Sequence, residues 1–353
     1  MSTSIPKTMK ALVQEDKKKA SVKEIAVPAL EPNDVLVKVQ YTAQQNPTDW
    51  KHAAFLSPPG AILGCDFSGT VVALGTNLAV PLKVGDKVAG SVHGGLYPDK
   101  GSNAEYLRAE SDLVFKVPEG LKLDEAATYG IGWGTACQTL VHSQGQQFPP
   151  AKVAGSPWLL IYGASSSVGL FAVELAKAMG YKVVAVCSPH SYDLVKSYGA
   201  DELVDYHDGD AASAEIKRIT GGTLERGLDT ISEGSSFKIA IGGFGDKGGR
   251  LNAILPPPDE AKAIRKDIEI VNTLMYTIFG KPFKFGPNEI PANPKDREFA
   301  VEWLRRTPEL ITKFGIRSNP VVLRGGLEHV TEGWQEMKDG KVSGKKLVYK
   351  IAE

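Results

Sequence analysis

The sequence has no charge imbalance, few cysteines and no long apolar run. Its 353 residues contain 41 Lys and Arg against 41 Asp and Glu, which gives no indication of a nucleic-acid partner or of binding to an anionic membrane. The apolar runs have the length of strands, so we expect no membrane-spanning helix. The first residues lack the apolar core of a secretory signal, and three scattered cysteines without a CxxC pair favour a reducing, cytoplasmic setting.

Length and turn spacing indicate two domains. A single hydrophobic core stops growing at roughly 250–300 residues, so a chain of this length favours two. Between Lys10 and Val117 the sequence consists of strand-length segments, many of them separated by Gly, Pro, Asn or Asp. Short strands at this spacing predict an antiparallel, barrel-like domain.

An alternating pattern begins at Trp158. Strands are predicted near residues 158–163, 182–187, 202–205, 227–231 and 249–254. Helices are predicted near residues 166–179, 190–198, 209–219 and 235–241. Such alternation predicts an α/β fold with a doubly wound parallel sheet of the Rossmann type.

The regular alternation fades after the proline run at 256–258. The later elements are predicted as a helix near 295–313, a strand near 319–324, a helix near 326–338 and a last strand within 345–351. We therefore assign residues 1–128 and 285–353 to the barrel-like domain, and residues 129–284 to the dinucleotide-binding domain.

The turn after the first strand of the alternating series is suited to a dinucleotide pyrophosphate. Such a site needs a sharp turn, close backbone approach to phosphate and tight helix–strand packing, which three glycines commonly provide. Here Ser166 occupies the place of the middle glycine. The predicted phosphate-binding residues are Gly163, Ala164, Ser165, Ser166, Ser167 and Val168. A serine at a helix start is also a common N-cap, so capping alone is the competing interpretation.

The end of the second predicted strand of this series favours NADPH over NAD. An Asp or Glu at that place accepts hydrogen bonds from the ribose 2′-OH of NAD and would repel a 2′-phosphate. This chain has Ser188, His190 and Ser191 there, with no acidic residue among them. Tyr206, at the end of the third strand, is expected to close over the same phosphate, and Lys196 is an alternative cation.

The whole chain resembles the medium-chain dehydrogenase/reductase superfamily. The resemblance rests on NPTDWK (46–51), LGCDFSGTV (63–71), VGDKVAG (84–90), AEYL (104–107), GIGWGTA (130–136), GASSSVG (163–169), SYGAD (197–201) and GKKLVYKI (344–351). Within the superfamily the chain is similar to the zinc-independent quinone oxidoreductase and enoyl reductase branch. The segments SPHSYDLVKSYGAD and TIFGKPF resemble the trans-acting enoyl reductases of the lovastatin type, which partner fungal polyketide synthases. The resemblance implies a GroES-like barrel beside the Rossmann domain.

The zinc ligands of the related alcohol dehydrogenases are missing. Those enzymes carry a Cys at the position of Asn46 and a His-Glu pair at the positions of Cys65 and Asp66. They also carry four closely spaced cysteines in the stretch that corresponds to Gly94–Ser111, where this chain has none. A catalytic zinc needs about three protein ligands. We therefore expect a zinc-independent enzyme, and reduction of an activated double bond is favoured over alcohol oxidation.

The resemblance also implies catalytic positions. In the resembling reductases a Lys and a Thr reach the nicotinamide side of the interdomain cleft, and they correspond to Lys51 and Thr135. Asn46 is expected to hydrogen-bond the substrate or the nicotinamide. A surface lysine, a helix cap and a turn asparagine are the competing interpretations. Tyr129, Tyr276 and solvent are alternative proton sources.

Two further residues are expected at the cofactor. They are Leu255, beyond the fifth strand of the series, and Lys345, which precedes the last strand. A solvent-facing lysine is the alternative for Lys345. Acceptor selection is expected from the segments near 46–57, 92–101 and 274–290.

Together these features predict an NADPH-dependent reductase that adds hydride to the β-carbon of an α,β-unsaturated carbonyl. Quinone reduction and non-catalytic NADPH binding are the alternatives, whereas a methyltransferase is disfavoured because the second strand lacks a terminal acid. The expected partners are a small-molecule or carrier-bound substrate and a polyketide synthase. The irregular 255–290 segment could remodel the edge strands through which dimers pair, which favours a monomer over a homodimer.

Overall fold

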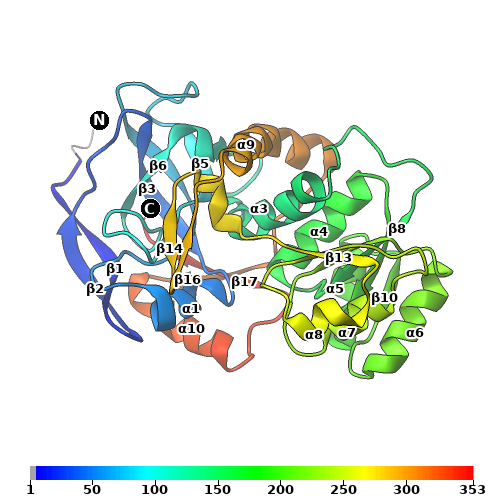
Figure 1. Cartoon of the computed structure of the whole chain (residues 1–353). Helices are drawn as coiled ribbons and strands as arrows, with labels where there is room; N and C mark the ends of the chain where they lie inside the picture. Colours follow the sequence, from blue (N-terminus) through cyan, green and yellow to red (C-terminus); the bar gives the residue numbers. More distant parts are fainter. Residues whose placement is uncertain (1–4, 353) are drawn as a thin grey trace. The chain divides into compact units, whose positions relative to one another are not determined.

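The chain forms two structural units, drawn in Figure 1. A computed structural model describes residues 5–352. Unit 1 contains the chain up to Gly132 together with 276–311 and the segment from Ser318 onward, and unit 2 contains 133–275 and 312–317. The sequence predicted domain boundaries between residues 128 and 129 and between residues 284 and 285. It also gave 312–317 to the barrel-like domain, whereas the structure groups this segment with unit 2.

Unit 1 is built on a mixed, mainly antiparallel sheet. The strand order is β16-β17-β3-β4-β5-β7, and β6 pairs with β3 outside this path. The strands are β3 (Asp34–Ala43), β4 (Asp66–Leu74), β5 (Lys87–Ser91), β6 (Tyr106–Glu110), β7 (Val114–Lys116), β16 (Val321–Gly325) and β17 (Lys346–Lys350). Buried Val35, Val37 and Val39 of β3 contribute to a core with Phe67 and Val71 of β4. β-branched and aromatic side chains suit such a pleated, buried surface.

Smaller elements complete unit 1. A separate hairpin joins β1 (Thr8–Asp16) to β2 (Lys19–Ala26), and a second hairpin, which the sequence analysis missed, joins β14 (Phe283–Phe285) to β15 (Asn288–Ile290). The helical segments are α1 (Thr48–Lys51), η1 (His52–Leu56), η2 (Ser111–Leu113), α2 (Leu123–Ala126), η3 (Ala127–Tyr129), η6 (Met275–Phe279), α9 (Pro294–Phe314), η7 (Leu327–His329) and α10 (Val330–Lys338). Helix α3 (Ile131–Cys137) begins in unit 1 and continues into unit 2.

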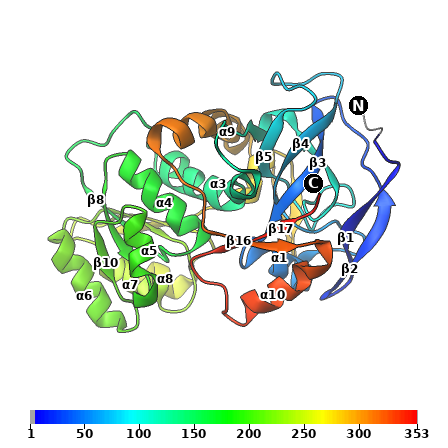
Figure 2. The same ribbon diagram turned by 180° about the vertical axis from the view of Figure 1, so that it is seen from behind.

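Unit 2 is a six-stranded parallel sheet with the order β10-β9-β8-β11-β12-β13. Its strands are β8 (Trp158–Tyr162), β9 (Lys182–Val186), β10 (Glu202–Val204), β11 (Arg226–Asp229), β12 (Gly249–Ala253) and β13 (Ile268–Asn272). Its helical segments are η4 (Gln138–Ser143), α4 (Ser167–Ala178), η5 (Pro189–Ser191), α5 (Tyr192–Ser197), α6 (Gly209–Thr220), α7 (Ser236–Gly242) and α8 (Asp259–Ile264). Figures 1 and 2 show helices on both faces of this sheet. When the strands are numbered along the chain, their order across the sheet is 3-2-1-4-5-6, which is the Rossmann order.

The predicted fold class is confirmed, and most predicted elements lie within a few residues of the observed ones. Strand β13 was missed because it is an edge strand, half exposed along its length, and so lacks the continuous apolar run of a central parallel strand. Among the residues that the structure describes, no helix is long and apolar enough to cross a membrane.

Candidate functional site

The switch point of the unit 2 sheet lies between β8 and β11. These strands are adjacent in the sheet, although two others separate them in the chain. In doubly wound sheets a ligand binds at the carboxyl ends of the strands at such a point. The turns after the two strands meet here, since Ser166 Oγ lies 2.8 Å from Thr230 Oγ1. The predicted phosphate turn therefore stands where the topology expects a ligand.

Two glycines make this turn possible. Gly163 has φ +73°, a left-handed conformation that glycine adopts without strain. A Cβ at Gly169 would lie 2.4 Å from the carbonyl oxygen of Gly163 and 2.7 Å from Ala164 Cα. Helix α4 thus packs directly on the backbone of the turn, which is the close helix–strand approach that a dinucleotide site requires.

The hydroxyl of Ser166 is engaged inside the turn. As the N-cap of α4 it accepts the Gly169 N–H at 3.0 Å. Thr230 Oγ1 has two carbonyl acceptors at 2.9 Å, those of Tyr162 and Gly163, so its single proton is committed and Ser166 must donate to it. Ser166 is thus an N-cap, and the amides at the start of a helix are the kind of group that binds anions.

The other predicted phosphate-turn residues differ in exposure. Ala164 and Val168 are buried, whereas Ser165 and Ser167 are half-buried. The two serines are therefore the side chains of this turn, apart from Ser166, that have access to a ligand.

Two of the predicted 2′-phosphate residues, Ser188 and Tyr206, come together after β9 and β10. Ser188 Oγ donates to Tyr206 Oη at 2.9 Å. His190 is exposed and Ser191 is buried in the neighbouring η5. Leu255 is half-buried just beyond β12.

One carboxylate near this place was overlooked. Asp205 follows β10, and the bonded His207 ring lowers the pKa of its carboxyl. The ring of His207 also stacks on Tyr206, with centroids 4.5 Å apart. The spacing Asp-x-His next to the predicted Tyr206 was the available signal, and it places a hydrogen-bonded Asp–His pair beside the Ser188–Tyr206 hydrogen bond.

In unit 1 the Asn46–Lys51 segment is internally ordered. Trp50 Nε1 donates to Asn46 Oδ1 at 3.0 Å, which orients the Asn46 amide with its NH₂ directed away from the Trp50 donor. Lys51 is the last residue of α1, with Nζ 5.8 Å from the centroid of the Trp50 ring. Thr135, in α3, is buried, and its carbonyl accepts from Thr139 Oγ1 at 2.7 Å.

Three segments of unit 1 meet in an aromatic cluster. The rings of His93 and Tyr276 stack with centroids 4.1 Å apart, and His52 approaches Tyr276 edge-on at 5.3 Å. Phe283 packs on His93 at 4.9 Å. These residues come from the segments that the sequence analysis expected to select the acceptor. Tyr129, the other tyrosine considered as a proton source, is buried against Phe115 instead.

The two histidines of this cluster are neutral. His52 Nδ1 lies 2.9 Å from the Thr48 carbonyl oxygen, which can only accept, so Nδ1 carries the proton and Nε2 is an acceptor. Burial lowers the pKa of both His52 and His93. Among the residues that the structure describes, neither Nε2 has a hydrogen-bond partner, and the same is true of the nearby buried Ser57 Oγ. Buried polar atoms normally have partners, so this cluster has unused hydrogen-bonding capacity.

Burial also raises the pKa of three acidic groups in and next to this cluster, those of Tyr276, Cys65 and Asp49. The Tyr276 hydroxyl lies 3.5 Å from Cys65 Sγ, and burial raises the pKa of both groups well above their usual values. Burial raises the pKa of Asp49 to about 7. Its Oδ2 accepts the Gln45 N–H at 2.6 Å. Asp49 is therefore a buried acid that titrates near neutral pH.

Lys346, which the sequence analysis did not single out, is buried, whereas the predicted Lys345 is exposed. Lys346 Nζ donates to Asp66 Oδ2 and to Gln45 Oε1, each at 2.6 Å. Asp66 Oδ1 accepts the Ile131 N–H at 2.6 Å. Both carboxylate oxygens of Asp66 are thus engaged within the protein.

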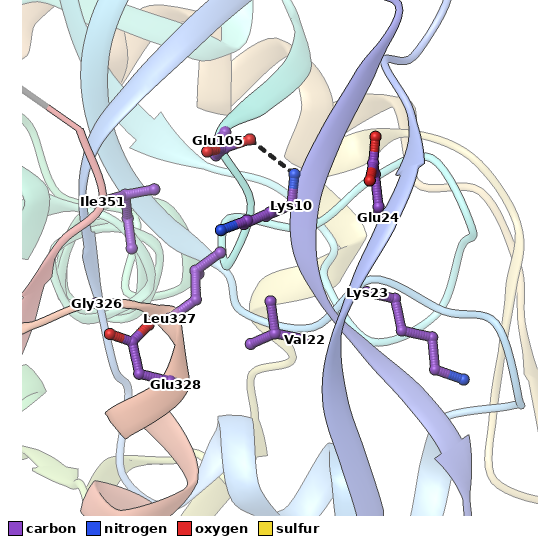
Figure 3. A pocket seen from close by; sticks show the side chains of 9 residues that line it. All are labelled: Lys10, Val22, Lys23, Glu24, Glu105, Gly326, Leu327, Glu328 and Ile351. Carbon is purple, nitrogen blue, oxygen red and sulfur yellow. Dashed lines mark hydrogen bonds between the residues drawn. The ribbon is translucent and has the colours of Figure 1, made fainter.

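A surface pocket of about 470 Å³ lies elsewhere in unit 1 (Figure 3). Its floor includes the hydrogen bond from the Lys10 N–H to Glu105 at 2.7 Å. The lining residues are Lys10, Val22, Lys23, Glu24, Glu105, Gly326, Leu327, Glu328 and Ile351. None of the predicted site residues lines this pocket, so it is not part of the candidate site.

Comparison with known proteins identifies the family. Residues 31–119 match the alcohol dehydrogenase GroES-like domain, and residues 167–277 match the zinc-binding dehydrogenase family. The chain is 40% identical over 352 residues to trans-enoyl reductase ACTTS2 of Alternaria alternata, which covers 98% of this chain and 99% of that protein. The chain belongs to the trans-enoyl reductase family. The predicted superfamily, that of the medium-chain dehydrogenases and reductases, is confirmed by the same matches.

Solved structures share the fold. CurK enoyl reductase aligns with a TM-score of 0.78 at 18% identity, covering 98% of this chain and 100% of that one. Mycobacterial Rv1454c, solved in complex with NADPH, aligns with a TM-score of 0.75 at 18% identity, covering 97% of this chain and 99% of that one. The Rossmann strand order and the glycine-tight turn before α4 suit a nicotinamide cofactor.

The residues present in this family member do not suit zinc. Asp66 already has its counter-charge in Lys346. Within residues 5–352 no three His, Cys, Asp or Glu side chains gather in a group that could hold a metal.

Proposed function

We propose that the protein is an NADPH-dependent, zinc-independent enoyl reductase. The observation that carries the proposal is membership of the trans-enoyl reductase family over nearly the full chain. The Rossmann order of the unit 2 sheet and the turn at Gly163–Gly169 support the cofactor assignment. When bound, the nicotinamide would supply a hydride to the β-carbon of an α,β-unsaturated carbonyl.

The residues of unit 2 would bind and select the cofactor. The first-turn amides of α4 point their partial positive charge at the pyrophosphate. Ser188 and Tyr206 would receive the 2′-phosphate, because β9 ends in a hydroxyl where an NAD enzyme has an acid. The Asp205 carboxylate is paired with His207, which would reduce its repulsion of that phosphate.

Lys51, Thr135 and Asn46 would act on the reacting groups. An ammonium at Lys51 stabilises negative charge that develops on the substrate carbonyl oxygen. The Thr135 hydroxyl and the amide NH₂ of Asn46 can orient the nicotinamide or the substrate by hydrogen bonds. Tyr276, like any tyrosine, carries its proton at neutral pH and is a candidate donor to the α-carbon beside solvent. Burial raises its pKa, which makes the hydroxyl a weaker acid.

The acceptor is proposed to be a carrier-bound enoyl thioester that a partner polyketide synthase supplies. The His52–His93–Tyr276 cluster, with its unpartnered ring nitrogens, would face the acyl chain and select among substrates. We also propose that the enzyme is a monomer and acts in the cytoplasm; the three cysteines are unpaired, which is compatible with a reducing compartment.

The test is steady-state oxidation of NADPH or NADH with a short enoyl thioester and with a quinone. We expect turnover of the thioester with NADPH, and loss of about 100-fold or more in kcat/KM for Lys51→Ala, since one stabilising group at a developing oxyanion contributes 10²–10³. Preferential quinone turnover would favour the quinone oxidoreductase alternative. Tight NADPH binding without turnover of any acceptor would favour the non-catalytic one.

A further inference from the structure

A buried ion pair lies at the junction of four chain segments in unit 1. Lys346 is 2% exposed and Asp66 is 0% exposed. Lys346 is the first residue of β17 and Asp66 is the first residue of β4. Burial raises the pKa of Asp66, and the Lys346 ammonium and the Ile131 N–H limit that rise by stabilising the carboxylate. Removing both charges from water is costly, so the pair is weak evidence for stability alone.

One side of the pair fixes the Asn46–Lys51 segment. Lys346 Nζ donates to Gln45 Oε1 at 2.6 Å, and Gln45 directly precedes this segment. The Gln45 backbone N–H in turn donates to Asp49 Oδ2 at 2.6 Å, so the side chain of Asp49 in α1 binds the backbone just before the helix. Lys51 is at the end of the same short helix. The ammonium of Lys346 is therefore linked to Lys51 through two hydrogen bonds and one helical turn.

The other side of the pair fixes the start of α3. Asp66 Oδ1 accepts the N–H of Ile131, the first residue of α3, at 2.6 Å. The approach leaves no space for a side chain at the preceding residue, since a Cβ on Gly130 would lie 2.1 Å from Asp66 Oδ1. A carboxylate at a helix start also interacts favourably with the helix dipole. Helix α3 carries Thr135 one turn later.

We propose that the Lys346–Asp66 pair is a positioning device that fixes the starts of α1 and α3, and so orients Lys51 at the end of α1 and the first turn of the helix that carries Thr135. The inference rests on the proposed function for its catalytic readout. The pair touches neither reacting group itself. Its buried charges are oriented by one another and form three hydrogen bonds at fixed places, which a single apolar contact could not do.

The test compares Lys346→Met with Asp66→Asn/Lys346→Met, and uses Lys341→Met as the control. Lys341 is an exposed lysine whose ion pair with Asp339 lies at the surface. For each variant we would measure kcat, the KM for the enoyl thioester, the Kd for NADPH, the melting temperature and amide hydrogen exchange in peptides that cover 45–51 and 130–137. Lys346→Met alone leaves the Asp66 carboxylate buried without its counter-charge. The double variant removes this unpaired charge.

We expect Lys346→Met to lower kcat by about 100-fold, the scale of a 1 Å misplacement, while the Kd for NADPH stays close to the wild-type value. Exchange should rise in both peptides. The double variant should regain melting temperature but not kcat, because the link to Gln45 is still missing. Lys341→Met should match the wild type in every measurement.

Recovery of kcat together with stability in the double variant would show a purely structural pair and overturn the inference. Unchanged exchange in both peptides would also overturn it. If the wild type turned over no acceptor, the proposed enzymatic function would fail, while the exchange data would still decide whether the pair holds the two segments. If Lys346→Met did not fold, Lys346→Gln, whose amide still donates, should show a smaller loss of kcat and intermediate exchange; wild-type kcat and exchange in that variant would refute the inference.

Discussion

Substitution of Gly169 by alanine tests whether the tight turn before α4 is a cofactor site. The added Cβ would lie 2.4 Å from the Gly163 carbonyl oxygen and 2.7 Å from backbone atoms of Ala164. Because these are backbone atoms, relief requires α4 to move away from β8. Overpacking of this kind costs about 1–3 kcal/mol, whereas Gly→Ala within a helix gains about 1 kcal/mol, so we expect a net loss of up to about 2 kcal/mol in unfolding free energy.

Gly209→Ala is a matched control for this substitution. Gly209 is also in the first turn of a helix in unit 2, α6, which like α4 has 12 residues. A Cβ there would meet only Ile239 side-chain atoms, at 3.6–3.7 Å, which is ordinary contact. We expect Gly209→Ala to be neutral or stabilising by up to about 1 kcal/mol.

The assays are urea unfolding and fluorescence titration with NADPH. We expect Gly169→Ala to weaken NADPH binding by at least about tenfold, which corresponds to 1.4 kcal/mol, and Gly209→Ala to leave it unchanged. Equal stability of the two variants would refute the packing argument. A destabilised Gly169→Ala that bound NADPH normally would show a tight turn that does not bind the cofactor.

Two further outcomes follow from the charges. Burial raises the pKa of Asp49 from 3.8 to about 7, so between these values the folded state holds a proton that the unfolded state releases, and this group makes stability fall as pH rises through that window. Asp49→Asn should remove this fall in stability, which is measured as melting temperature against pH. Parallel profiles for the wild type and the variant would contradict the raised pKa of Asp49. Ser188→Asp should weaken NADPH by about 100-fold or more in a titration and spare NADH, because like charges about 4 Å apart repel by up to about 4 kcal/mol, whereas Ser188→Asn should not discriminate in this way. Equal weakening of both coenzymes by Ser188→Asp would place the 2′-phosphate elsewhere.

The local strand–turn–helix pattern of unit 2 was easier to predict than the long-range interactions in unit 1. Gly163, Ser166 and Gly169 lie within one turn, and Ser188 follows the next strand, so their relation depends on a local strand–turn–helix pattern. The rule for the ribose-binding acid applies to the residues after the second strand of the series, whereas Asp205 follows β10, the third strand. The rule therefore did not point to Asp205.

The sequence by itself determined the alternating elements of unit 2, the tight turn before α4 and the absence of an acid directly after β9, since periodicity and turn chemistry act over a few residues. Only the tertiary structure decided which lysine of the final strand is buried, and that it meets an aspartate 280 positions earlier. It also decided that His52, His93 and Tyr276 share one cluster. The physical reason is that these contacts join residues far apart in the chain, and no local pattern specifies which distant side chains will pack together.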